Sequence, residues 1–407
     1  MRRANNQDSF AAVVASSEER FGKVGHLFVV ADGMGAHAAG ELASKIAAEK
    51  IAHYYLRSDG VDASQALRQA MMSANSDIYR RGQENPEFHN MGTTASSLVL
   101  VPEGAVIGHV GDSRVYRLRG EAIEQLTFDH SLVWEMQAAG QVRPGSELAS
   151  AIPKNVITRS LGPYPDVAVD LEGPLKVEVG DKFLLCSDGL TGQVTDEEIG
   201  ALMMALEPDL AVRVLIDLAN LRGGPDNITV IIAKVTNGSA EVARPIRPVK
   251  HSINEPLAAV CIAGVIAVIF LLVTKNYLLA IVPLIVSIVA GLWFAKQYYP
   301  AASNTFEPIK GPVRSTTSPY RRYSANPRPE MVQHFVETIE QISRAAEQRR
   351  WRINWEPIKS FELEAKERLN EKKPMLALRA MAMAINETMT QLRHQQTKAA
   401  TESTVDL

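Results

Sequence analysis

Apolar residues in the first 235 positions fall into two kinds of run. Short runs rich in Val, Ile, Leu and Phe predict β-strands. These are Ala11–Val14, Leu27–Ala31, Ser96–Val101, Ala105–Val110, Arg114–Arg119, Lys182–Cys186 and Thr229–Val235. Longer runs with helical spacing predict helices over Glu41–Leu56, Ala63–Arg81 and Leu210–Leu221. The Gly- and Pro-punctuated stretch 135–165 predicts an irregular lobe. Together these runs predict one α+β domain over residues 1–235.

Two further runs, Leu257–Val273 and Leu278–Ala295, are almost wholly apolar. At 1.5 Å rise per residue each spans roughly 26 Å, close to the hydrocarbon thickness of a bilayer. Basic residues flank the pair, and only Lys275 lies between the two runs. The positive-inside rule therefore predicts a two-span hairpin over 257–295 in the inner (cytoplasmic) membrane, with both termini cytoplasmic. The alternative is a buried helical hairpin of a soluble domain.

The remaining segments read as linkers and helices. Residues 236–256 predict a polar linker, and the proline-rich, basic residues 296–330 predict a second one. Residues 331–407 predict an α-helical region, because apolar residues recur there at helical spacing. We interpret this region as a small bundle or coiled-coil pair, and we expect it to bind partners or to mediate self-association.

Composition narrows the class of protein. The chain has 407 residues and a formal net charge of −3, which does not favour a nucleic-acid surface. It has 2 cysteines, Cys186 in a predicted strand and Cys261 in an apolar run, so a disulfide between them is not expected. The low cysteine content fits a reducing compartment.

Four aspartates mark the ends of predicted strands. Two apolar runs end in Asp-Gly, at Asp32 and Asp188, and two begin just after Asp8 and Asp226. In an antiparallel sheet the end of one strand lies beside the start of its neighbour. The four carboxylates are therefore expected to gather at one end of a sheet stack. Clustered carboxylates repel one another unless a cation holds them, and hard divalent cations prefer oxygen ligands.

Seven short segments occur in a specific order, and together they carry more information than any one of them. They are 3–8, 32–44, 91–94, 111–117, 126–131, 186–190 and 224–229. Over residues 1 to about 235 the chain resembles the metal-dependent protein phosphatases of the protein phosphatase 2C family, bacterial subtype. The resemblance implies two packed antiparallel β-sheets flanked by helices. It also implies two Mn²⁺ or Mg²⁺ ions, with room for a third, and hydrolysis of phosphoserine and phosphothreonine.

The resemblance also implies a set of metal ligands. Asp32 matches the carboxylate that bridges the two ions, and Gly33 matches a residue whose backbone carbonyl adds a ligand. Asp188 and Asp226 match ligands of the second ion. Asp112 matches a position that, with Asp188, holds a third ion in bacterial members.

Two positions match residues that act on water and substrate. Asp8 matches a carboxylate that orders metal-bound water. Arg3 matches the arginine that holds the phosphate, and its planar fork suits that ligand. Eukaryotic relatives carry a histidine where this chain has Met34, so the proton donor is unassigned, although His37 is near. Family members have a further stretch before the arginine, so either the true start lies upstream or one sheet lacks an edge.

These features predict a membrane-anchored serine/threonine phosphatase whose attacking water is held between two divalent ions. Its expected partners are phosphoserine and phosphothreonine proteins, the products of serine/threonine kinases. A competing interpretation is a catalytically weak or inactive pseudophosphatase, a membrane scaffold that binds phosphoproteins. A sensor or transporter subunit is not favoured, because the two spans contain no Asp, Glu, Arg or His.

Overall fold

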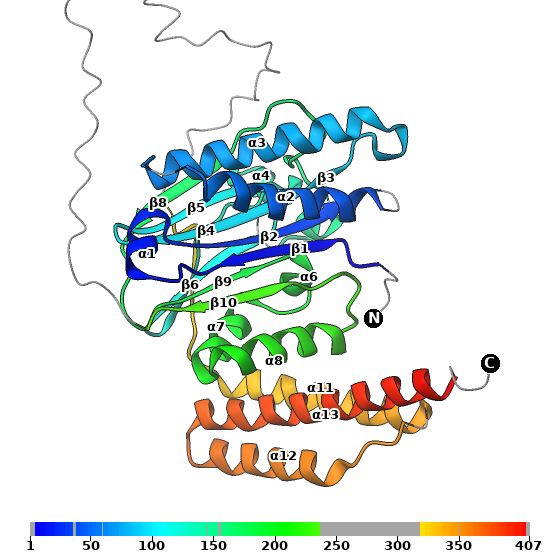
Figure 1. Cartoon of the computed structure of the whole chain (residues 1–407). Helices are drawn as coiled ribbons and strands as arrows, with labels where there is room; N and C mark the ends of the chain where they lie inside the picture. Colours follow the sequence, from blue (N-terminus) through cyan, green and yellow to red (C-terminus); the bar gives the residue numbers. More distant parts are fainter. Residues whose placement is uncertain are drawn as a thin grey trace, which may run out of the picture. The chain divides into compact units, whose positions relative to one another are not determined.

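Two antiparallel β-sheets lie face to face at the centre of the fold (Figure 1). The computed structural model describes residues 5–35, 38–58, 60–143, 145–153, 156–236, 318–349 and 351–403. The first sheet has the strand order β1-β2-β4-β5-β8, with β3 paired to β2. Its strands are β1 (Asp8–Val13), β2 (His26–Met34), β3 (Gly92–Thr93), β4 (Ala95–Val101), β5 (Gly104–Val110) and β8 (Asp170–Leu175).

The second sheet has the strand order β10-β9-β6-β7-β11. Its strands are β6 (Arg114–Arg119), β7 (Ala122–Gln125), β9 (Lys182–Cys186), β10 (Val230–Lys234) and β11 (Arg321–Ser324). Apolar side chains from the two inner faces form one buried cluster between the sheets. Its members include Phe28, Leu98 and Ile107 from the first sheet and Val115, Phe183 and Leu185 from the second.

Helices cover the outer face of the first sheet. Helices α2 (Ala39–Tyr55) and α3 (Ala63–Glu84) bury a run of small residues, and α1 (Glu18–Val24) and a 3-10 turn at Pro86–Phe88 complete this side. Ala43 and Ala47 are fully buried on α2. Small side chains let the helix approach the sheet closely, and this holds the chain that follows Asp32 against the strands.

The outer face of the second sheet carries α6 (Asp188–Thr191), α7 (Asp196–Ala205) and α8 (Pro208–Leu221). Helix α7 begins with a capping box, in which the Thr195 and Glu198 side chains each bond the other residue's backbone N–H. Two short helices, α4 (Leu132–Ala138) and α5 (Glu147–Ala151), lie in the stretch predicted to be an irregular lobe.

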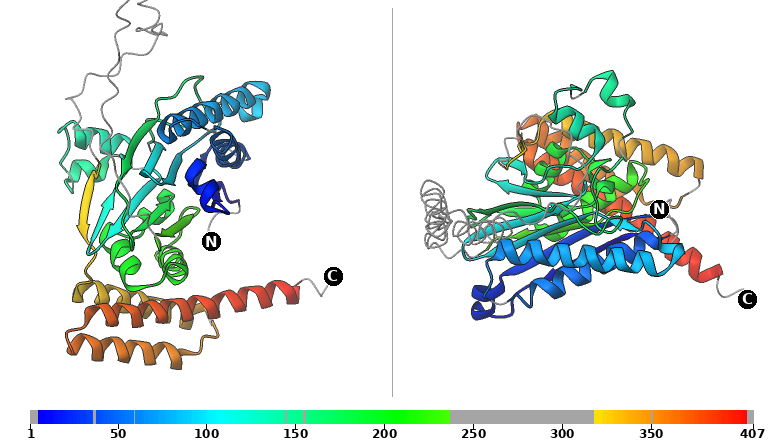
Figure 2. Two further views of the ribbon diagram at one scale, coloured as in Figure 1. Left: turned by 60° about the vertical axis from the view of Figure 1, so that its left-hand side comes forward. Right: turned by 90° about the horizontal axis from the view of Figure 1, so that it is seen from above.

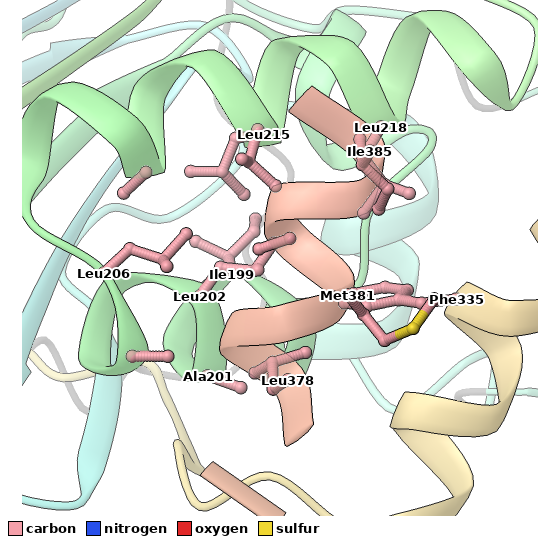
Figure 3. Close-up of a cluster of buried hydrophobic side chains, with 14 of the residues drawn as sticks. Ile199, Ala201, Leu202, Leu206, Leu215, Leu218, Phe335, Leu378, Met381 and Ile385 are labelled. Carbon is pink, nitrogen blue, oxygen red and sulfur yellow. The ribbon is translucent and has the colours of Figure 1, made fainter. Parts of the chain in front are cut away.

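Three C-terminal helices form a further layer on α7 and α8 (Figures 1 and 2). They are α11 (Pro329–Arg349), α12 (Trp355–Asn370) and α13 (Pro374–Ser403). Figure 3 shows apolar side chains of α11 and α13 meeting those of α7 and α8 in one buried cluster. This cluster joins Phe335, Leu378, Met381 and Ile385 to Leu202, Leu206, Leu215 and Leu218.

Polar contacts also hold α13 against α7 and α8. The Arg379 guanidinium donates to the carbonyl of Ala205 at 3.0 and 2.7 Å, where α7 ends. A cation at the end of a helix satisfies a carbonyl that has no partner within the helix, and it interacts favourably with the negative end of the helix dipole. Arg393 donates to the buried Asp217 of α8 at 2.5 Å. The apolar faces that we expected to serve partners or self-association are therefore packed, at these residues, against helices of the same chain.

The predicted linker over 296–330 is wrong at its C-terminal end. Arg321–Ser324 form β11, which pairs antiparallel with β7, Arg321 opposite Gln125 and Tyr323 opposite Ile123. Helix α11 already begins at Pro329. The strand escaped prediction because four residues are too few for an alternating pattern, and the prolines around them favour a linker.

The stretches predicted to cross a membrane, within 257–295, lie outside the described residues, as do residues 237–256. In the described part of the chain, no helix is both long and apolar enough to span a bilayer.

Candidate metal centre

Asp8 and Asp32 lie opposite each other in the first sheet. Asp8 is the first residue of β1, and its register partner across the strand pair is Asp32 near the end of β2. Directly opposed residues project from the same face of a sheet. Backbone bonds hold this end together, because Gly33 N–H donates to the carbonyl of Gln7 at 3.0 Å. Asp32 N–H donates to Thr94 Oγ1 at 2.9 Å.

The second sheet brings Asp188 and Asp226 to the same end. Asp188 opens α6 directly after β9, and Asp226 precedes β10. Strands β9 and β10 are antiparallel, with Val230 opposite Cys186. Ser187 N–H donates to the carbonyl of Thr229 at 3.1 Å, which extends the pairing toward the two aspartates. In Figure 1, α6 and the start of β1 lie at the same end of the sandwich.

Asp8 links the two sheets. Its Oδ2 accepts hydrogen bonds from Ser187 Oγ at 2.7 Å and from Thr229 Oγ1 at 2.7 Å. Ser187 directly follows β9 and Thr229 directly precedes β10 of the second sheet, while Asp8 belongs to the first. The gathering of strand-end carboxylates that the sequence predicted is therefore present. The sequence analysis did not identify Ser187 and Thr229 as partners of Asp8. Their only indication in the sequence is that each lies within three residues of a predicted site aspartate.

Burial and neighbouring carboxylates raise the pKa values of Asp8, Asp32 and Asp112. Burial, followed by the charges of Asp8, Asp188 and Asp112, raises the pKa of Asp32 well above its ordinary value. Burial, then Asp188, raises the pKa of Asp112 to about 8. Burial also raises the pKa of Asp8, with Asp188 and Asp226 contributing and the two hydroxyls opposing. A cluster of this kind is unfavourable when ionised unless positive charge is added.

Two oxygens in this cluster show what would satisfy it. Asp8 Oδ1 and Asp112 Oδ1 are buried and have no hydrogen-bond partner among the described residues. An unsatisfied buried oxygen is costly, and a hard cation with oxygen ligands removes that cost. Within the described ranges, no three His, Cys, Asp or Glu side chains are arranged to hold an ion by themselves. Mg²⁺ and similar ions accept such a site, since one or two carboxylates suffice when carbonyls and water complete the shell.

The backbone is closely packed around Gly33, whose carbonyl is the predicted metal ligand. A Cβ at this position would lie 2.0 Å from the Gly40 carbonyl oxygen and 2.6 Å from that of Gln7. Only glycine allows this close approach of three backbone segments. The backbone at Gly33 is thereby held beside Asp32 and Asp8, with no side chain between them.

Asp112 is placed by the turn that follows β5. Gly111 has φ +109°, and a Cβ there would lie 2.6 Å from Thr94 Cβ. Gly111 N–H donates to His130 Nδ1 at 3.0 Å, and His130 N–H donates back to the carbonyl of Gly111 at 2.7 Å. Since Nδ1 accepts, the ring proton lies on Nε2, which is 3.0 Å from Asp170 Oδ2. His130 thus supports the Asp112 turn.

Asn227 ties the segment before Asp8 to the Asp226 loop. Its Oδ1 accepts from Gln7 N–H at 3.0 Å, and its Nδ2 donates to the carbonyl of Asn5 at 3.2 Å. Asn227 thus holds the residues leading into β1 beside the Asp226 loop. Arg3, the predicted phosphate ligand, and His37 lie outside the described residues.

Comparison with known proteins agrees with this geometry. The family described as Protein phosphatase 2C matches residues 2–214. Over 247 residues the chain is 37% identical to protein phosphatase PhpP of Streptococcus pneumoniae. The aligned region covers 59% of this chain and 96% of PhpP. The crystal structure of the serine/threonine phosphatase PstP of Mycobacterium tuberculosis is 35% identical, with a TM-score of 0.51, and covers 58% of this chain and 95% of that one.

A second structure, the catalytic domain of PstP in complex with 2 manganese ions, is 34% identical to this chain, with a TM-score of 0.50. The match covers 58% of this chain and 94% of that structure. Because the family match spans more than half of the chain, the chain belongs to the protein phosphatase 2C family, whose members are metal-dependent serine/threonine protein phosphatases. The predicted two-sheet fold and the manganese or magnesium cofactor are confirmed at this level. The match ends within α8, so β11 and helices α11, α12 and α13 lie beyond it.

Proposed function

We propose that this chain is a membrane-anchored serine/threonine phosphatase that removes phosphate from phosphoserine and phosphothreonine proteins. The observation that supports the chemistry best is the meeting of Asp8, Asp32, Asp112, Asp188 and Asp226 at one end of both sheets, with buried carboxylate oxygens left unsatisfied. Two divalent ions, when bound there, supply a nucleophile from water and screen the phosphoryl oxygens.

The chain's own residues have separate tasks in this proposal. Asp32, the Gly33 carbonyl, Asp188 and Asp226 hold the two ions, and Asp112 offers a carboxylate for a third. Asp8 orients the attacking water, and its own orientation is fixed by the hydroxyls of Ser187 and Thr229. Arg3 binds the phosphate of the substrate through its guanidinium fork.

The membrane anchor in this proposal rests on the apolar runs within 257–295 and on the basic residues that flank them. A cysteine at Lys275 tests it, because Lys275 is expected on the far side of the membrane. In intact cells, Lys275→Cys should react with a membrane-impermeant maleimide, whereas Arg322→Cys should react only after lysis. Equal labelling of the two variants in intact cells would refute this topology.

The activity is tested with the purified full chain, using a phosphothreonine peptide with and without Mn²⁺. Turnover should require Mn²⁺ and should fall by about 100-fold or more in Asp188→Asn, since a metal ligand is lost. Asp209→Asn, an exposed aspartate of α8, is the matched control and should keep full activity. A wild-type chain that binds Mn²⁺ yet shows no turnover would instead support the pseudophosphatase interpretation.

A further inference from the structure

Strand β11 and the residue before it bring a C-terminal segment into contact with the lobe that follows β7. We define the lobe as residues 131–161. Tyr320 N–H donates to the carbonyl of Gln125 at 2.9 Å, and β11 continues along β7 from there. Figure 2 shows β11 as the yellow strand at the edge of the second sheet. The pairing places Tyr320 and Arg321 beside the point where the chain leaves β7 for the lobe.

Arg321 packs on the residue that anchors the lobe's first helix. Trp134 is the buried residue of α4, with only 8% of its surface exposed. The Arg321 guanidinium carbon lies 3.9 Å from the centroid of the Trp134 ring, and Arg321 Nη2 is 3.4 Å from Gln137 Oε1 on the same helix. A guanidinium this close to an indole face is a favourable cation–π contact. A residue from beyond position 317 therefore covers the anchor of α4.

Tyr320 supports the same contact through Phe128. Its ring meets Phe128 edge-on at 5.6 Å, and Phe128 in turn meets Trp134 edge-on at 5.0 Å. The Tyr320 hydroxyl donates to Glu172 of β8 in the first sheet. This set of side chains joins β11, α4 and both sheets.

The lobe has two stems, His130 just before it and Leu161 at its end. Both stems are hydrogen-bonded to residues that neighbour or contact a site aspartate. At the first stem, His130 exchanges two hydrogen bonds with Gly111, the neighbour of Asp112. At the second, Leu161 exchanges two backbone hydrogen bonds with Thr93, at 3.0 and 2.9 Å. Thr93 Oγ1 donates to the carbonyl of Asp32 at 2.8 Å. A displacement of the lobe would thus act on the backbone at Asp112 and Asp32.

We propose that Arg321 is a positioning residue for the phosphatase site. By holding Trp134 it fixes α4 and the lobe, and through the His130–Gly111 pair it fixes the turn that carries Asp112. The C-terminal extension is thereby a working part of the site, although the family match ends before it. This inference rests on the proposed function, since it assigns Arg321 to the metal centre of that reaction.

Two neighbouring arginines provide a matched test in the full chain. Arg321 covers Trp134, whereas Arg322 is exposed and only approaches Glu124 at 3.7 Å. Amide hydrogen exchange of the metal-free protein should be about 5-fold faster over α4 in Arg321→Ala than in wild type. Arg322→Ala should match wild type, and Arg321→Lys should recover part of the protection because lysine keeps a weaker cation–π contact.

Mn²⁺ binding, followed by electron paramagnetic resonance, gives a readout that does not depend on turnover. We expect weaker Mn²⁺ binding in Arg321→Ala and unchanged binding in Arg322→Ala. Equal exchange or equal Mn²⁺ affinity in the two variants would overturn the inference. A wild-type chain that binds Mn²⁺ without hydrolysing phosphopeptide would count against the proposed function, while these two measurements would still decide whether Arg321 positions the Mn²⁺ site.

Discussion

The two parts of this phosphatase chain differ in what their sequences disclose. In residues 8–234, aspartates at strand ends mark the site, because antiparallel pairing decides which strand ends meet. In residues 318–403, helical spacing shows that Leu378, Met381 and Ile385 share an apolar face, but it does not identify the surface that this face covers. That surface is α7 and α8 of the first part. A local sequence pattern therefore predicts which side chains are buried. The surface that they pack against depends on the complete fold.

The largest effect should come from removing residues 318–407. Without α11 and α13, Leu202, Leu206, Leu215 and Leu218 lose their cover, and each buried leucine contributes about 1.5–3 kcal/mol. The total approaches the whole stability of a typical domain. We expect the shortened chain to aggregate or to bind a hydrophobic dye strongly, as measured by gel filtration and dye fluorescence.

The matched control keeps both parts and replaces residues 240–312 with a flexible Gly/Ser linker. This protein should stay soluble and folded, because the described contacts between the two parts are all retained. A soluble, well-folded chain after removal of 318–407 would contradict the docking.

A single core substitution should cause the next largest effect. Leu378 is fully buried between α13 and α7, so Leu378→Ala should lower the free energy of unfolding by about 2–5 kcal/mol. Leu363 lies on the neighbouring helix with 67% of its surface exposed, and Leu363→Ala should change stability by less than about 0.5 kcal/mol. Denaturant unfolding measures both, and equal values would mean that α13 is not docked.

Gly33→Ala tests the packing of the backbone at the metal centre, in the first of the two parts. The added Cβ would lie 2.0 Å from the Gly40 carbonyl oxygen, so the backbone must move at a cost of about 1–3 kcal/mol. Mn²⁺ binding should weaken with it. Gly22→Ala is the control, since nothing lies within 4 Å of its added Cβ and alanine favours the α1 helix. Unchanged Mn²⁺ affinity in Gly33→Ala would exclude a close-packed backbone at the centre.

A smaller effect should depend on pH. Burial favours a higher pKa for Glu198, but the Arg222 guanidinium, at 2.6 Å, lowers the pKa below its ordinary value of 4.5. A lowered carboxyl pKa stabilises the fold above the unfolded value and loses that contribution as pH falls through the folded value. Glu198→Gln should therefore cost about 1.5 kcal/mol at pH 7, and the difference from wild type should shrink below pH 4.5.

Arg222 also lies 5.8 Å from the ring of Phe335, so this pair stands where α7, α8 and α11 meet. Chemical denaturation at several pH values checks the prediction. A difference between wild type and Glu198→Gln that stays constant down to pH 3 would contradict the assigned ion pair.

The sequence predicted the two-sheet fold, helices α2, α3 and α8 and a helical C-terminal region, because these depend on short patterns and on motif order. It also predicted that aspartates at strand ends would lie at one end of the sheets, but it did not predict α7. It did not predict β7 or β8, which are short and mixed in polarity, nor Ser187 and Thr229 as partners of Asp8. Hydroxyl pairs of that kind are set by strand register, which requires the fold. It also placed β11 in a linker, since its pairing with β7 joins residues about 200 positions apart.

The central claim is that residues 318–403 complete the fold of the phosphatase domain that precedes them. A protease site introduced into the proline-rich stretch 300–312 of the full chain tests it most directly. After cleavage in detergent, we predict that the two fragments co-elute on gel filtration and keep Mn²⁺-dependent phosphopeptide hydrolysis. Separation of the C-terminal fragment from an N-terminal fragment that stays folded and fully active would contradict the claim.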